Sequence, residues 1–88
     1  MPNLIAAERG SQLAAEKQLL VKAEADIENG WSRLRNQEDL LGWLRISGHN
    51  TVEAERLVEL MKQTLIQWER HRVLIEQRIA YLESKIPT

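Results

Sequence analysis

The 88-residue chain contains no cysteine and no phenylalanine, and its two prolines stand at positions 2 and 87. Without cysteine it forms neither a disulfide nor a thiolate metal site. A chain this short buries only a little over half of the surface that it exposes when unfolded. Because cysteine cross-links cannot compensate for so small a core, we expect association with another chain to provide additional burial.

An excess of charge of one sign is also missing, as is any long hydrophobic run. Twelve Lys and Arg residues stand against thirteen Asp and Glu residues, so no strong field draws the chain onto nucleic acid or an anionic membrane. The opening stretch MPNLIAAERG has no signal-peptide core, and no run is long enough to span a bilayer. We therefore expect a cytoplasmic protein with no membrane partner.

What the chain does contain is typical of helices. Leu, Ala, Glu, Gln, Arg and Lys are abundant, and helix breakers are rare between the two prolines. No stretch alternates apolar and polar residues with enrichment in β-branched side chains, as strands do. The composition predicts an all-α fold.

The second half carries a heptad seam, in which residues recur at alternating spacings of three and four. A second row beside the seam widens the apolar face, so this helix should touch more than one neighbour. The seam consists of Val58, Met61, Leu65, Trp68, Arg72, Ile75, Ile79, Leu82 and Ile86.

The first half contains the turn-like dipeptide Asn29-Gly30, which raises the question of a break. The seven-residue spacing of the hydrophobic residues predicts no break, because a turn at this dipeptide would interrupt that spacing. We therefore predict one continuous helix, although a glycine inside a helix costs about 1 kcal/mol relative to alanine. The residues that keep the seven-residue phase are Leu13, Leu20, Ile27, Leu34 and Leu41.

The stretch RISGHNTVEAE, residues 45–55, is interpreted as the bend between two helices. Gly48 suits the left-handed position after a helix, and Asn50 or Thr51 suits the N-cap of the next one. Glu53 completes a plausible capping box with Asn50. His49 is then a loop residue between two caps.

Arms of nearly equal length predict a long antiparallel helical hairpin, coiled-coil-like, in which paired residue numbers sum to roughly 95 to 98. Gly30 then falls opposite the turn from Leu65 to Trp68, where it admits the indole; the alternative is a tolerated surface glycine. We expect a first helix at about 11–46, a turn at 47–50 and a second helix at about 51–86, in one domain, 1–88. The residues before Ser11 either extend the first helix or fray.

Residues 27–79 resemble a group of short, uncharacterised helical proteins of alphaproteobacteria, which carry a G-H-[DN]-T-x-x-A-E turn motif. The resemblance implies a bacterial cytosolic origin and supplies no activity. The residues that carry it here are Gly30, Arg33, Leu34, Gln37, Leu41, Leu44, Gly48, His49, Asn50, Thr51, Ala54, Glu55, His71 and Arg72.

Catalytic, metal and cofactor sites are not expected. His49 and His71 are 22 positions apart on one arm, which is ~33 Å of helix, too far to share an ion. Ser47 lies near His49, but such neighbours in a tight bend more often report capping than a nucleophile and its base. No Gly-x-Ser-x-Gly turn and no glycine-rich phosphate loop is present. We do not expect an enzyme.

In a single hairpin, apolar residues outside the seam would remain exposed to solvent, because the hairpin has no second layer of helices to cover them. We expect a homodimer that forms a four-helix bundle, and a non-catalytic interaction, regulatory or adaptor role. The expected self-association interface is Leu19, Leu40, Leu57, Leu60, Leu74 and Tyr81. Trp43, Ile66 and Val73 are a further possible partner surface. The alternative interpretation is that they are scattered apolar residues of an ordinary protein surface.

Two other functions are alternatives to this one. A ligand-binding or enzymatic pocket between helices would use the polar residues Glu16, Gln37, His71 and Arg72. Nucleic-acid binding would use the basic stretches at 31–35 and 70–72, but acidic residues interrupt both faces and the net charge is −1.

Overall fold

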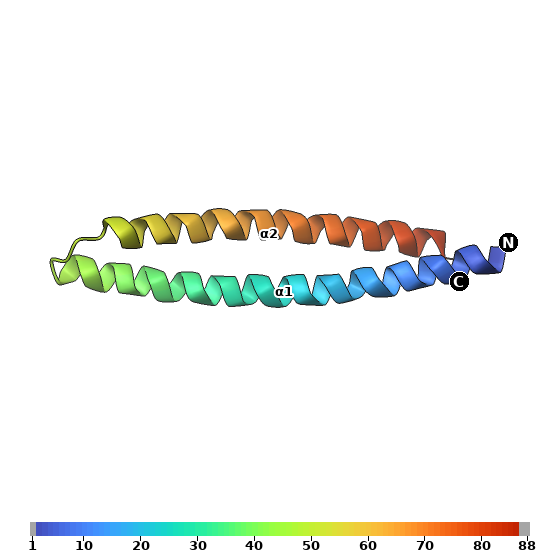
Figure 1. Cartoon of the computed structure of the whole chain (residues 1–88), viewed down its shortest axis with the longest axis horizontal. Helices are drawn as coiled ribbons and strands as arrows, with labels where there is room; N and C mark the ends of the chain where they lie inside the picture. Colours follow the sequence, from blue (N-terminus) through green and yellow to red (C-terminus); the bar gives the residue numbers. More distant parts are fainter. Residues whose placement is uncertain (1, 87–88) are drawn as a thin grey trace. The chain divides into compact units, whose positions relative to one another are not determined.

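The computed structural model describes residues 2–86, and the side chains of residues 6–86. Within that range it contains two long helices and no strand: α1 runs Pro2–Ile46 and α2 runs Val52–Lys85 (Figure 1). The all-α prediction is confirmed. The chain packs as two units, which are described separately below. Asp26–Glu69 form the turn unit, and residues 2–25 with residues 70–86 form the end unit.

Helix α1 passes through Asn29 and Gly30 without interruption, as the hydrophobic phase predicts. Along it, Ile27, Leu34 and Leu41 are buried, and the earlier members of the same row are half-buried. A constant phase of burial is what a continuous helix with one apolar stripe produces.

Helix α1 begins at Pro2, so the residues before Ser11 extend the helix, which is one of the two alternatives that the sequence leaves open. Proline is favoured in the first turn, where its missing N–H costs nothing. The following stretch AAER consists of good helix formers, and Gly10 alone costs only about 1 kcal/mol relative to alanine, too little to stop the helix.

The turn unit is a helical hairpin. In it, the part of α1 up to Ile46 runs antiparallel beside the first part of α2 (Figure 1). Ala54 and Met61 pack against the core as partly buried side chains. The core itself consists of Leu34, Leu41, Val58 and Leu65.

The end unit brings the early part of α1 beside the late part of α2. Ile75 and Ile79 are its buried side chains. The Arg78 Nε lies 3.0 Å from the Glu16 Oε1, and the Arg9 Nη1 donates to the Lys85 carbonyl oxygen at 3.2 Å. The pairs join α1 to α2 within this unit.

The bend ends α1 with a Schellman motif. The Gly48 N–H donates to the Arg45 carbonyl at 3.2 Å, and the His49 N–H donates to the Leu44 carbonyl at 2.9 Å. Gly48 has φ +74°, a conformation that is strained for residues with a Cβ. The predicted role of Gly48 as the left-handed residue after the helix is therefore confirmed.

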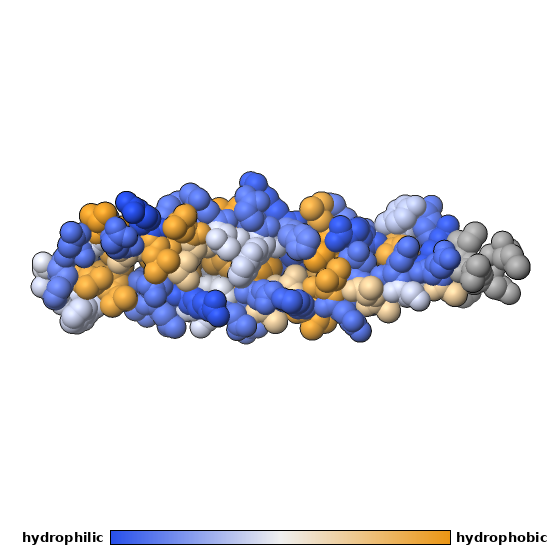
Figure 2. All heavy atoms as spheres, viewed as in Figure 1, coloured by the Kyte–Doolittle hydropathy of each residue, from blue (hydrophilic) through white to orange (hydrophobic). Residues whose placement is uncertain are grey.

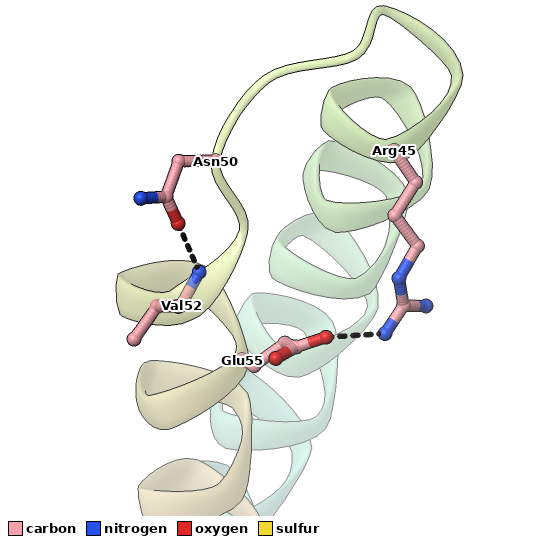
Figure 3. A network of polar contacts seen from close by, with 4 residues as sticks. All are labelled: Arg45, Asn50, Val52 and Glu55. Carbon is pink, nitrogen blue, oxygen red and sulfur yellow. Dashed lines mark hydrogen bonds and ion pairs between the residues drawn. The ribbon is translucent and has the colours of Figure 1, made fainter.

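The start of α2 uses both expected cap residues. The Thr51 carbonyl accepts the first helical bond, from the Glu55 N–H at 2.8 Å, and the Asn50 Oδ1 accepts from the Val52 N–H at 2.9 Å (Figure 3). Glu53 was expected to complete a capping box, but its carboxylate lies 3.5 Å from the Arg56 Nη1.

Candidate functional site

All the residues predicted to lie at interfaces are exposed, with fractions from 43% at Leu57 to 63% at Tyr81. On the face shown in Figure 2, apolar side chains reach the surface between charged ones. Exposure makes these side chains available to another molecule, and the interfaces themselves remain predictions. The turn unit holds Leu40, Trp43, Leu57, Leu60 and Ile66, and the end unit holds Leu19, Val73, Leu74 and Tyr81.

Two of these residues, Leu57 and Leu60, border an apolar groove in the turn unit. The groove is open to solvent and has a volume of about 270 Å³. Helix α1 contributes Gly30 and Arg33 to it. The lining from α2 consists of Leu57, Leu60, Met61, Thr64, Leu65 and Trp68.

Gly30 faces α2 at a point where the two helices approach closely. A Cβ at Gly30 would lie 2.7 Å from the Leu65 Cδ2 and 3.2 Å from the Trp68 Cζ3. The predicted pairing of Gly30 with the turn from Leu65 to Trp68 is therefore confirmed. Trp68 itself was expected within the buried seam but is 40% exposed, because an indole is too large to be enclosed between two helices that pack this closely.

The two sides of the turn unit differ in chemistry. On the helical wheel, Leu57 and Thr64 fall on one side of the buried row that contains Val58 and Leu65, and Glu55 and Glu69 fall on the other. We call the side with the groove the groove face and the side with the two glutamates the polar edge.

The polar edge joins α1 to α2 through polar contacts. The Arg45 Nη2 lies 2.9 Å from the Glu55 Oε1 (Figure 3), and the Trp31 Nε1 donates to the Glu69 Oε1 at 3.2 Å. These four polar side chains have partners within the chain, whereas the groove face offers mainly apolar side chains.

Trp43 and His49 have a structural role at the bend. Their rings stack with centroids 5.4 Å apart and planes inclined by 22°. A contact between the residue that follows the left-handed glycine and a residue in the last turn of the helix commonly accompanies the Schellman motif. The structure thus supports the interpretation of His49 as a loop residue, and Trp43, 57% exposed, still presents most of its indole to solvent.

The polar residues considered for a pocket between helices include two that form ion pairs in the end unit. The Glu16 carboxylate pairs with Arg78, and the Arg72 Nε lies 3.6 Å from the Glu76 Oε1, one turn along α2. The distance of 3.6 Å is too long for a hydrogen bond, and the Arg72 Nε and the Glu16 Oε2 are buried without a hydrogen-bond partner in the described part of the chain.

Within residues 2–86, no three His, Asp or Glu side chains converge in a way that would hold a metal ion. In the same part of the chain, neither helix has an apolar stretch sufficient to cross a membrane.

Sequence reasoning missed Arg33 and Thr64 as groove residues. Both stand in the rows that flank the seam, next to the seam position that Gly30 occupies. A glycine in a heptad seam lets the facing helix approach closely, and the residues that flank it line the groove beside that contact. This signal was present in the sequence.

Comparisons of the chain with protein-family models, curated proteins and solved structures found no match. The function is therefore inferred from the surface chemistry described above.

Proposed function

We propose that this protein is a non-catalytic helical interaction module that self-associates, with two copies contributing their helices to a four-helix bundle. The observation that carries the proposal is the large apolar surface of the single chain. Seven hydrophobic side chains are buried, whereas fourteen large ones are exposed, among the residues that the structure describes. A single chain thus exposes more large apolar side chains than it buries.

The tryptophans support the same proposal. All three are at least 40% exposed: Trp31 at 41%, Trp43 at 57% and Trp68 at 40%. Tryptophan is enriched in the centres of protein interfaces, where burial of a large rigid ring contributes strongly to binding. The proposal gives Trp68, which lines the groove, a reason to be exposed in the single chain.

Thermal unfolding at different chain concentrations tests the proposal. A hundredfold increase in concentration stabilises a dimer that unfolds to single chains by about 2.8 kcal/mol. This should raise the midpoint followed by far-UV circular dichroism by about 5 °C or more. A midpoint that does not change with concentration would show that the chain folds alone and would refute the proposal.

A further inference from the structure

We infer that two copies meet through the groove face of the turn unit, with Thr64 of one copy near Thr64 of the other on a two-fold axis. The inference rests on the proposed self-association and adds which face is covered and in which register. Of the six residues expected at the self-association interface, Leu57 and Leu60 border the groove. Leu40 also lies in the turn unit and the remaining three lie in the end unit, and the inference does not depend on these four.

The shape of the groove favours a side chain from another helix over a small molecule. Ligand pockets typically enclose most of their ligand. This groove is open, and Leu60 beside it is 54% exposed. A protruding side chain next to a gap is self-complementary, because a two-fold axis places each leucine against the partner's groove.

The distribution of charge selects the groove face over the polar edge. Arg33 is the one charged residue among those that line the groove, and its long side chain allows the guanidinium to stay in solvent at the rim while the stem packs. A second copy seated on the polar edge would instead desolvate the Arg45–Glu55 ion pair, which is costly without new partners. Two copies that meet at the groove leave this pair hydrated.

Thr64 is suited to the centre of such an interface. Its Oγ1 donates to the Leu60 carbonyl at 2.9 Å, so the hydroxyl hydrogen has a partner before any second copy arrives. The residue is small and lies between Leu60 and Trp68 along the groove. Alternation of small and large residues across facing positions lets two helices pack closely, with the two Thr64 residues facing each other and Leu60 facing the partner's Trp68.

Single cysteines test the register, since the natural chain contains none. Thr64→Cys in the full chain, treated with diamide at low micromolar concentration, should form a disulfide-linked dimer at least tenfold faster than Ile66→Cys. A disulfide requires Cα atoms within about 4.4–6.8 Å, which a position on the axis satisfies. Ile66 is the matched control because it is exposed in the same unit and does not line the groove. Equal rates, or faster linkage of Ile66→Cys, would overturn the inference.

A second pair of variants tests the face by light scattering. Leu60→Glu should reduce the particle mass of the wild type to that of one chain, and Ile66→Glu, at a site of nearly equal exposure, should keep the wild-type mass. If Leu60→Glu fails to fold, the cysteine result decides, because Thr64→Cys introduces no charge. A dimer that survives Leu60→Glu and is lost with Ile66→Glu would overturn the groove face and leave self-association standing.

A wild type that is monomeric refutes self-association and the inference together. If that monomer binds 8-anilinonaphthalene-1-sulfonate and the Leu60→Glu variant does not, the groove is a site for small apolar ligands.

Discussion

Replacement of Gly30 by alanine has two opposing effects on the free energy of unfolding, a gain in helix propensity and a steric cost. Alanine is favoured over glycine inside a helix by about 1 kcal/mol, so the change would stabilise α1 if space allowed. The new methyl group would lie 2.7 Å from the Leu65 Cδ2 and 3.2 Å from the Trp68 Cζ3. Leu65 is 3% exposed and belongs to the core of the turn unit, so it cannot move without displacing its neighbours.

Overpacking of this kind typically costs about 1–3 kcal/mol. The steric cost therefore exceeds the gain in helix propensity, and we expect Gly30→Ala to destabilise the protein by about 1 kcal/mol. Gly42→Ala is the matched control, since Gly42 lies in the same helix and unit and a methyl group added there would have nothing within 4 Å. It should stabilise by about 0.5–1 kcal/mol.

Thermal or urea unfolding at one fixed chain concentration measures the difference. The two variants should differ by about 2 kcal/mol, with Gly42→Ala above the wild type and Gly30→Ala below it. In a Leu65→Val background, which lacks the δ carbons, Gly30→Ala should become less harmful, so the double-mutant cycle should show coupling. If Gly30→Ala stabilises as much as Gly42→Ala, the close approach of the helices at Gly30 is refuted.

Changes at three further positions concern the bend. Gly48→Ala should cost about 1–2 kcal/mol, because alanine must adopt the φ of +74° that glycine adopts without strain; an unchanged urea midpoint would contradict the Schellman geometry. Asn50→Ala should lower the free energy of unfolding by about 1 kcal/mol, because the hydrogen bond from the Val52 N–H is lost. Asn50→Asp should retain stability, because the carboxylate can accept the same bond. Equal losses in both variants would show that the side-chain acceptor is not what stabilises the start of α2. Glu55→Gln should change the free energy of unfolding by less than about 1 kcal/mol, because Arg45 and Glu55 form an exposed pair; a larger loss would indicate that this pair is buried in the assembled protein.

The two helices and the position of the bend were predictable from the sequence, for identifiable reasons. The phase from Leu13 to Leu41 specifies one continuous helix through Gly30, and Gly48 marks its end. The start of α1 was not predictable in the same way, because residues 2–10 contain no strong stop signal and Ser11 resembles an N-cap. The local sequence is compatible with a helix that starts at Pro2 and with one that starts at Ser11.

The groove was only partly predictable. The pairing of Gly30 with Leu65 and Trp68 follows from the register of the hairpin, but the exposure of Trp68 depends on how closely the helices approach. Periodicity assigns a residue to a face and does not give the distance between two faces. The exposed apolar residues Leu57 and Leu60 were predictable from the row beside the seam, whereas the molecule that covers them is not encoded in the periodicity.

Self-association is tested most directly by sedimentation equilibrium of the wild-type chain at micromolar concentration. We expect a mass of twice the 10.2 kDa of the single chain, with helical circular dichroism throughout. A well-folded species of 10.2 kDa at the same concentration would contradict the proposed dimer.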